Sequence, residues 1–394
     1  MVLVTETFAP EVNGVAMTLG HLVNGLAERG HRIEVVRPRQ PEEPPPPTHT
    51  HITHVLRPGM GIPRYHGLRL GMPSHRFLRA RFRERRPDVV HVATEGPLGW
   101  SALNVACSMG IPVSTSFHTN FHDYSRHYGA GFMGGLVLWW LRRFHNRARV
   151  TMVPSADLIL SLSARGFRDL RLLGRGVDTR LFDPSKRDSE LRRHWGASDQ
   201  TLVALHVGRL APEKNIDLAV QAFRRLRLWV PDAVMIITGD GPEHDHLART
   251  YPDVILVSSR APAELARYYA SADCFLFPSL SETYGNVCAE GMASGLPVLA
   301  FSYAAPAKLI RDGVNGFLVP FSDAAAFIER ACVITRDREM LQRVGVTARD
   351  TSLALSWDAV VDRFASYLNA VACGLPLPDH APQPDPGEPV AVPG

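Results

Sequence analysis

The sequence lacks the long apolar runs and paired cysteines that mark several large classes of protein. The nearest approach to a long apolar run, residues 136–141, is far shorter than the roughly 20 residues of a membrane-spanning helix, and two arginines follow it. The five cysteines are scattered without any CxxC spacing, so neither a disulfide framework nor a structural zinc site is expected. Free thiols are typical of a reducing compartment, and we therefore expect a cytoplasmic protein.

Charge is distributed unevenly along the chain. The net charge is only +4 over 394 residues, yet residues 1–198 have 11 more basic than acidic side chains. Residues 199–394 have 7 more acidic than basic side chains. The basic half could contact an anionic membrane surface, although a solvated arginine-rich surface is the ordinary alternative. Nucleic acid is not an expected partner, because no aromatic-interleaved motif accompanies the arginines.

Short apolar strands alternate with amphipathic helices along most of the chain. This alternation predicts an α/β fold with parallel sheets and crossover helices. The length of 394 residues is about twice that of a typical domain, so two Rossmann-like domains are expected. Ligands of such sheets bind at the carboxyl ends of the strands. The candidate strands are residues 2–5, 33–36, 89–93, 113–116, 151–153, 202–207, 233–238, 254–257, 274–277, 297–300 and 316–319.

The same pattern predicts the limits of the domains. We expect an N-terminal domain over residues 1–182 and a second domain over residues 200–356, joined by a polar linker over residues 183–199. A last helix is expected over residues 357–372. The proline-rich residues 374–394 are expected to be disordered.

The most informative segment extends from Pro278 to Pro297. It follows an apolar strand and enters a helix, and Glu290 lies eight residues after Glu282. The turn at residues 283–287 should present free backbone N–H groups at the helix N-terminus, where the helix dipole favours an anion. A carboxylate beside such a phosphate site is suited to accept hydrogen bonds from sugar hydroxyls. The alternative is that Glu282 caps the helix and Glu290 is a solvated helix residue.

A cationic loop follows another predicted strand. Arg209 and Lys214 lie five residues apart, just before a predicted helix. Arginine can bind a diphosphate through two parallel hydrogen bonds, and lysine adds a point charge. The sequence has only three lysines beside 40 arginines, which makes the position of Lys214 more informative. An ordinary charged loop is the alternative.

Two loops of the first half complete the set of candidate residues. Gly14, before a predicted helix, would allow a phosphate to approach the backbone closely. The loop does not have the GxGxxG pattern, so a nicotinamide cofactor is not supported. At the carboxyl end of a predicted strand, His118, Asn120 and His122 could face a substrate oxygen. The alternative for each histidine is a satisfied core residue.

No metal ion is expected. His49, His51 and His54 lie close together in the sequence, but no carboxylate or cysteine accompanies them. Alternating histidines more often form one polar face of a strand than a metal site.

Taken together, these segments resemble the retaining glycosyltransferases of family 4, which have the GT-B fold. The resemblance covers the chain to about Val371 and rests on the Glu-x7-Glu element, on the Gly-Arg-Leu-x-Pro-Glu-Lys segment ending at Lys214, and on the Gly-Val-Asp178 segment with Phe182. The Phe-His-Thr-Asn-Phe-His segment and the Asn-Gly-Val opening resemble a bacterial branch with GDP-mannose-dependent α-mannosyltransferases and diacylglycerol glycosyltransferases. The fold implied by the resemblance is two Rossmann-like domains with a donor/acceptor cleft between them.

The resemblance also implies a role for each candidate residue. Arg209 and Lys214 would neutralise the donor diphosphate as the leaving group departs. Glu282 would hold hydroxyls of the transferred sugar, and Glu290 would hold the ribose. His118 would contact the sugar and help to order the acceptor side. Backbone amides near Gly14 and at Tyr284, Gly285, Asn286 and Val287 would add to diphosphate binding, and Asn120 and His122 would lie on the acceptor side.

The implied activity is retaining transfer of a hexose from a nucleotide-diphosphate sugar to a lipid or glycan acceptor, with no other cofactor. GDP-mannose is the favoured donor and UDP-glucose the next. Two departures from the family pattern are Gly291, which replaces the usual alanine, and residues 258–260, which replace a glycine-containing loop near the base. The alternatives are a GT-B-like sugar-nucleotide epimerase and a transferase with a soluble acceptor.

A lipid acceptor would require contact with a membrane surface. Phe77, Leu78 and Phe82 lie among arginines at helical spacing, and Trp139 and Trp140 precede two further arginines. Basic and aromatic residues in short helices suit the lipid interface. We therefore expect peripheral attachment of the first domain at the inner face of the plasma membrane. The alternative is that these aromatic residues pack in the domain core.

Overall fold

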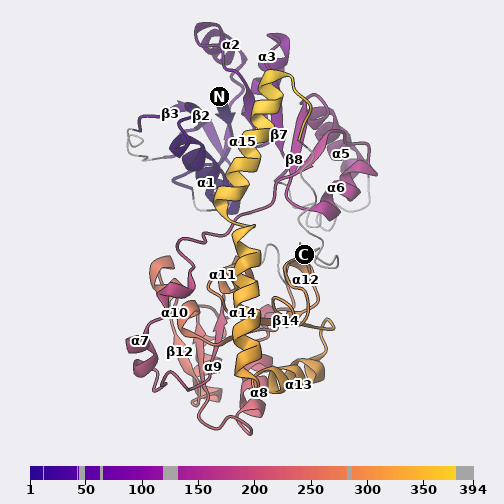
Figure 1. Ribbon diagram of the computed structural model, residues 1–394. Coiled ribbons are helices and arrows are strands. Elements are labelled where there is room, and N and C mark those ends of the chain that lie inside the picture. Colours follow the sequence, from indigo (N-terminus) through magenta and orange to yellow (C-terminus); the bar gives the residue numbers. More distant parts are fainter. Residues whose placement is uncertain are drawn as a thin grey trace, which may run out of the picture. The chain divides into compact units, whose positions relative to one another are not determined.

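Most strands of the computed structural model form two parallel sheets, each with helices packed against it (Figure 1). The structure describes residues 1–11, 13–41, 43, 49–62, 65–118, 132–281 and 286–378. One compact unit contains residues 1–175 together with the described residues 357–378, and the other contains residues 176–356. The α/β fold predicted from the sequence is confirmed. None of the helices in the described ranges combines the length and hydropathy needed to cross a membrane.

The sheet of the first unit has the strand order β3-β2-β1-β6-β7-β8-β9. The chain passes from β1 to β2 on one side and later adds β6 on the other, so the strand order reverses between β1 and β6. Such a switch point is where open parallel sheets bind ligands, at the carboxyl ends of the strands. The strands are β1 (Val2–Val4), β2 (Ile33–Pro38), β3 (Ile52–Arg57), β6 (Val90–Val92), β7 (Val113–Ser116), β8 (Val150–Val153) and β9 (Leu170–Leu172).

Helices and one antiparallel hairpin connect these strands. The first helix begins at Asn13, whose side chain accepts hydrogen bonds from two backbone N–H groups of the first turn. The carboxylate of Glu6 accepts hydrogen bonds from Leu98, at the start of α3, and from Gly71, at the end of the hairpin. These elements are α1 (Gly14–Glu28), α2 (His75–Glu84), α3 (Pro97–Ser108), α5 (Phe132–His145) and α6 (Ala156–Ser163), with β4 (Gly59–Ile62) and β5 (Tyr65–Gly71) as the hairpin.

The last helix, α15 (Trp357–Cys373), belongs to the first unit although it follows the second unit in sequence. Its apolar face, which includes Val361 and Phe364, enters the same core cluster as α1 and β1. The two helices pack tightly at Gly25 of α1, where an added Cβ would lie 2.6 Å from Val361. Arg29 donates a hydrogen bond to Asp362 at 2.7 Å beside this contact. The core of the first unit is therefore completed by residues from the end of the chain.

The sheet of the second unit has the order β12-β11-β10-β13-β14-β15, and its strand order reverses between β10 and β13. Leu205 faces one core cluster and Ala204 the other, as the alternation of a buried strand requires. The strands are β10 (Val203–Val207), β11 (Val234–Thr238), β12 (Ile255–Val257), β13 (Cys274–Phe277), β14 (Val298–Phe301) and β15 (Phe317–Val319). The helices are η1 (Pro184–Lys186), α7 (Ser189–His194), η2 (Pro212–Lys214), α8 (Ile216–Leu226), α9 (His244–Thr250), α10 (Pro262–Ser271), α11 (Asn286–Ala293), α12 (Ala304–Leu309), α13 (Ala324–Ile334) and α14 (Arg338–Leu353).

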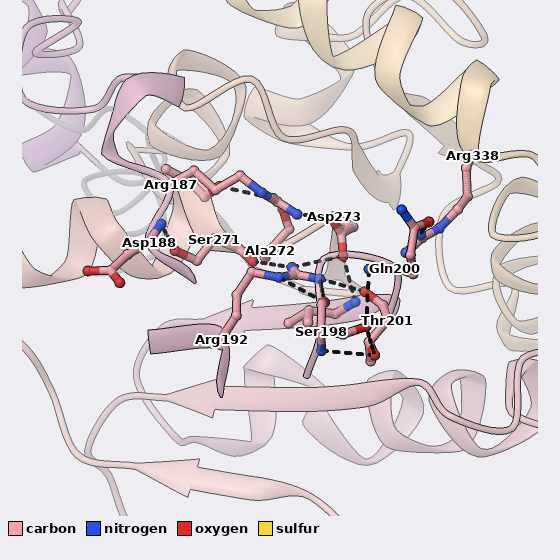
Figure 2. A network of polar contacts seen from close by, with 12 residues as sticks. Arg187, Asp188, Arg192, Ser198, Gln200, Thr201, Ser271, Ala272, Asp273 and Arg338 are labelled. Carbon is pink, nitrogen blue, oxygen red and sulfur yellow. Dashed lines mark hydrogen bonds and ion pairs between the residues drawn. The ribbon is translucent and has the colours of Figure 1, made fainter. Parts of the chain in front are cut away.

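Residues 183–199 are a folded part of the second unit, and the expectation of a linker there is wrong. Figure 2 shows Arg192 of α7 at the centre of a polar network. Its guanidinium is buried, pairs with Asp273 at 3.1 Å, and donates to the carbonyl oxygens of Ser271 (2.6 Å), Ser198 (2.7 Å) and Thr201 (2.6 Å). The segment is polar in sequence, but its buried arginine finds hydrogen-bond partners elsewhere in the unit, at Thr201, Ser271 and Asp273. The division between units lies at residues 175 and 176, before the predicted boundary at residue 182.

The membrane-facing role expected for α2 is also wrong. Leu78 and Phe82 are almost completely buried in the core of the first unit, and Phe77 packs against the same cluster. Of the arginines between them, Arg81 pairs with Glu34 of β2 and Arg79 donates to the Ser108 hydroxyl at the end of α3. Of the predicted disordered tail, residues 379–394 lie outside the described residues.

Candidate functional site

In the second unit, the loops after β10 and β13 meet at the switch point of the sheet. The ammonium group of Lys214 lies 3.4 Å from the Ser279 hydroxyl and 3.3 Å from the carbonyl oxygen of Ser281. The backbone N–H of Leu280 donates to the carbonyl oxygen of Glu213 at 2.8 Å. The structure thus joins the cationic loop to the segment that begins at Pro278, although the two lie more than sixty residues apart in sequence.

Two glycines hold the loop that presents Arg209. An added Cβ would lie 1.8 Å from a backbone oxygen of this loop at Gly239, and 2.2 Å from another at Gly241. Only glycine therefore allows the loop after β11 to pack so closely against the loop after β10. The Arg209 side chain is 68% exposed and pairs with Glu213 at 3.1 Å. Its guanidinium remains accessible to a ligand at this edge of the sheet.

Glu290 lies on the first turns of α11 and is partly buried. Its carboxylate accepts a hydrogen bond from the Tyr269 hydroxyl of α10 at 3.2 Å. Burial raises the pKa of Glu290 to about 7, and the Tyr269 hydrogen bond offsets only part of that effect. A ligand hydroxyl that donates to this carboxylate would favour its ionised form.

Of seven other predicted site residues, two lie within the described part of the chain. Asn286 and Val287 begin α11, with Asn286 exposed and Val287 packed against the core. The first N–H groups of a helix have no partner within the helix, so this turn offers donors to an anion. The remaining five residues lie outside the described ranges: Glu282, Tyr284, Gly285, Asn120 and His122.

In the first unit, Gly14 and His118 lie at the carboxyl ends of β1 and β7. An added Cβ at Gly14 would lie 2.9 Å from the guanidinium of Arg175, which places a cation beside the start of α1. The Nε2 atom of His118 is buried and has no hydrogen-bond partner in the part of the chain that the structure describes. Burial lowers the pKa of His118 to about 4; Glu95 opposes this shift and Arg175 adds to it. The ring is therefore neutral at pH 7.

Sequence reasoning did not find Arg175 or Glu95. Arg175 comes directly before the Gly-Val-Asp178 segment, so that segment could have pointed to it. Glu95 follows the predicted strand at residues 89–93, and a polar residue after a strand is a general signal for a site at the sheet edge. In the structure, Glu95 lies 3.2 Å from the Nε2 atom of His145.

One group of metal-ligating side chains occurs among the described residues, namely Asp217, Glu243 and His246. Asp217 also accepts a hydrogen bond from the Tyr251 hydroxyl at 2.7 Å. Exposed acidic groups of this kind are common without a metal, and we assign none here.

The arrangement at the second switch point provides groups of the kind that bind a diphosphate. Two cations and a helix N-terminus face one sheet edge, with a carboxylate beside them that can accept hydrogen bonds from hydroxyls. Two parallel α/β units of this kind make up the GT-B fold. HepE from Anabaena in complex with UDP has the same fold, with a TM-score of 0.69 at 18% identity over 94% of this chain and 99% of that one. The sucrose-phosphate synthase of Thermosynechococcus elongatus gives a TM-score of 0.68 at 19% identity, covering 95% and 99% of the two chains.

Sequence comparison places the chain more narrowly. Residues 12–181 match the family described as Glycosyltransferase Family 4, and residues 201–337 match Glycosyl transferases group 1. A GDP-mannose-dependent alpha-mannosyltransferase of Mycolicibacterium smegmatis is 34% identical over 372 residues, which cover 94% of this chain and 96% of that protein. An alpha-monoglucosyldiacylglycerol synthase of Acholeplasma laidlawii is 28% identical over 369 residues, covering 86% and 88%. The protein belongs to glycosyltransferase family 4.

Proposed function

We propose that the protein is a retaining hexosyltransferase that uses a nucleotide-diphosphate sugar, with GDP-mannose favoured over UDP-glucose, and a lipid or glycan acceptor. The observation that carries the proposal is the junction of the Lys214 loop with the segment from Pro278 at the second switch point. The bond between the anomeric carbon and the diphosphate breaks, and the acceptor oxygen forms the new bond on the same face. The departing phosphate takes the acceptor's proton. Preorganised cations stabilise the negative charge that develops on the diphosphate.

Each predicted residue has a role in this proposal. Arg209 and Lys214 bind the diphosphate, Glu282 binds the transferred sugar, and Glu290 binds the ribose. His118 contacts the sugar and helps to order the acceptor. Backbone amides contribute near Gly14 and at Tyr284, Gly285, Asn286 and Val287, and Asn120 and His122 lie on the acceptor side.

A panel of sugar nucleotides tests the activity. The full chain is incubated with GDP-mannose, GDP-glucose, UDP-glucose and UDP-mannose, each with a membrane lipid extract, with soluble sugars, and alone. We expect the fastest transfer from GDP-mannose to lipid, with an α-linked product by NMR. Conversion of the sugar without any acceptor would support an epimerase instead. Transfer only to soluble sugars would contradict the proposal of a lipid acceptor.

The raised pKa of Glu290 predicts that donor binding depends on pH. A ribose hydroxyl that donates to Glu290 favours the ionised form, so binding should tighten as pH rises through about 7. Between pH 6 and pH 8 we expect the affinity for GDP-mannose to rise about five- to tenfold in calorimetry, as the ionised fraction grows. The diphosphate of a sugar nucleotide does not titrate in this range. Glu290→Gln should bind GDP-mannose more weakly, and its affinity should not rise with pH. An equal rise in this variant would contradict the assignment of Glu290 to the ribose.

We also propose peripheral attachment to an anionic membrane surface through α5. Leu136 is 52% exposed and Trp139 is 49% exposed on this helix, and Arg142 and Arg143 follow them. Arg143 lies over the Trp139 ring at 5.8 Å. An apolar face flanked by cations suits the lipid interface, and each cation near an anionic surface contributes about 1 kcal/mol.

Vesicle flotation tests this attachment. The protein should float with phosphatidylglycerol vesicles at low salt, and less with phosphatidylcholine vesicles or at high salt. Reversing both charges, Arg142→Glu with Arg143→Glu, should weaken binding at least tenfold. The control is Leu160→Gln on α6, where an exposed leucine of the same unit is removed without a change in charge. Protein that stays unbound to anionic vesicles at low salt contradicts the proposal.

A further inference from the structure

The first unit has a pocket of about 580 Å³ that does not contain any of the site residues predicted from the sequence. Helix α5 forms one wall and the turn at Glu95 and Gly96 forms the other. This volume is in the range of pockets that bury small molecules. The side chains that line it are mostly apolar: Leu136, Val137, Trp139, Trp140 and Leu141 from α5, opposite Glu95 and Gly96.

Aromatic packing against the core holds helix α5, which forms one wall of the pocket. Trp140 packs against Trp100 of α3, with 5.9 Å between ring centroids, and against Phe144 at 5.6 Å. Phe144 is completely buried in the core. The neighbouring Leu136 and Trp139 are half exposed, so the apolar wall continues from the core to the surface. A ligand could therefore place an apolar chain against α5 without disturbing the core.

A chain of buried hydrogen bonds holds the polar end of the pocket. The hydroxyls of Thr151 and Thr115 lie 2.9 Å apart, and Thr115 Oγ1 lies 3.0 Å from His145 Nδ1. His145 Nε2 lies 3.2 Å from a carboxylate oxygen of Glu95. With Thr151 donating to Thr115 and Thr115 donating to Nδ1, the Nε2 atom of His145 is the donor to Glu95. The strands β7 and β8 thus orient the carboxylate through a completely buried histidine.

Glu95 also belongs to the same sheet edge as the candidate residue His118. The two follow β6 and β7, which are neighbouring parallel strands. Glu95 and His145 both influence the pKa of His118, so the three side chains share one electrostatic environment. A carboxylate can accept several hydrogen bonds, so Glu95 can accept one from a ligand hydroxyl while it keeps its contact with His145.

We propose that this pocket binds the acceptor as an alcohol with an apolar chain. A hydroxyl of the ligand donates to Glu95, and the chain lies between Gly96 and the apolar face of α5. The inference rests on the proposed function, which it narrows to an acceptor with a lipid tail. The apolar lining selects the tail, and the single carboxylate at the end of the pocket selects the hydroxyl.

Binding of small matched probes tests the pocket without a membrane. Calorimetry on the full chain uses monooctanoylglycerol, glycerol, and methyl octanoate, which has the chain but no hydroxyl, all below the concentration at which they aggregate. We expect monooctanoylglycerol to bind one saturable site and at least tenfold more tightly than either other probe. Leu136→Gln and Trp139→Gln should weaken it about five- to tenfold, because each removes apolar contact. Glu95→Gln should weaken the binding of monooctanoylglycerol and leave the binding of methyl octanoate unchanged.

Leu160→Gln is the matched control and should bind all three probes as the unmodified protein does. Absence of saturable binding, or equal loss in the control, would overturn the pocket assignment. The pocket assignment would also be overturned if Leu136→Gln and Trp139→Gln changed vesicle flotation but not the binding of monooctanoylglycerol. GDP-mannose binding is measured in Leu136→Gln, Trp139→Gln and the control, where it should be unchanged. Its absence from the unmodified protein would contradict the proposed function while leaving the pocket in place.

Discussion

Lys214→Ala is expected to lower the transfer rate about 100-fold or more. The ammonium group lies at the junction of the loops after β10 and β13, where the proposed diphosphate gains negative charge as the sugar leaves. Removal of one preorganised group that stabilises such charge typically costs two to three orders of magnitude. The loss should appear in kcat/KM for GDP-mannose. Arg209→Ala should cost less, about tenfold, because its side chain is more exposed and solvent screens its charge.

Lys186→Ala is the matched control for this prediction. Lys186 is an exposed lysine of the same unit on η1, outside the two loops. Its replacement should leave the rate within about twofold of the unmodified protein, since isolated surface changes have small effects. Thermal melting confirms that each variant folds. A folded Lys214→Ala protein with a nearly normal rate would refute the assignment of this lysine to the diphosphate.

Asp273→Ala is expected to destabilise the second unit by about 3–5 kcal/mol, the usual cost of leaving a buried charge without its partner. Asp273 pairs with Arg192 at 3.1 Å and with Arg187 at 2.9 Å, and it accepts a hydrogen bond from the backbone N–H of Val203 at 2.8 Å (Figure 2). The Arg192 guanidinium is buried, and its carbonyl partners do not neutralise it. Scanning calorimetry should show one unfolding transition shifted to lower temperature.

Asp253→Ala provides the comparison. Asp253 forms ion pairs with Arg224 and Arg227 at the surface of the same unit, and such exposed pairs contribute about 0–1 kcal/mol. If both aspartate variants lower the transition temperature equally, the buried network contributes no more to stability than the exposed ion pairs do. Replacing Arg192 and Asp273 together by leucines should recover part of the loss, because no buried charge then remains.

The elements of the fold that could be predicted are those with a strong local signal. Strands such as β13 and β14 are continuous buried apolar runs, and α1 has its apolar residues on one face. By contrast, β3 has histidine and arginine within six residues, and β9 is only three residues long. Neither carries a pattern that distinguishes it from a loop. Residues 183–199 misled the prediction because their polarity is typical of a surface, whereas Arg192 meets its partners through tertiary contacts.

The candidate site divides in the same way. Arg209, Lys214 and Glu290 belong to short motifs, so their positions follow from local sequence and the strand-end rule. Glu95 acquires its role through His145, fifty residues later, and no local pattern reports that contact. On α2, helical spacing showed that Phe77, Leu78 and Phe82 share a face, but it could not show whether core or lipid covers that face. Only the packing in the first unit answers that question.

The membership of α15 in the first unit has a consequence for how the protein is made. A ribosome releases residues 1–175 first, then the entire second unit, and only then the helix that covers α1. Domains generally fold as units during synthesis, in order from the N-terminus. Here the second unit can complete its folding first. Leu22 and Leu26 of α1 stay without part of their core contacts until Phe364 and its neighbours have been synthesised. A nascent chain stopped just before Trp357 should therefore hold a folded second unit and an incomplete first one, a natural target for chaperones.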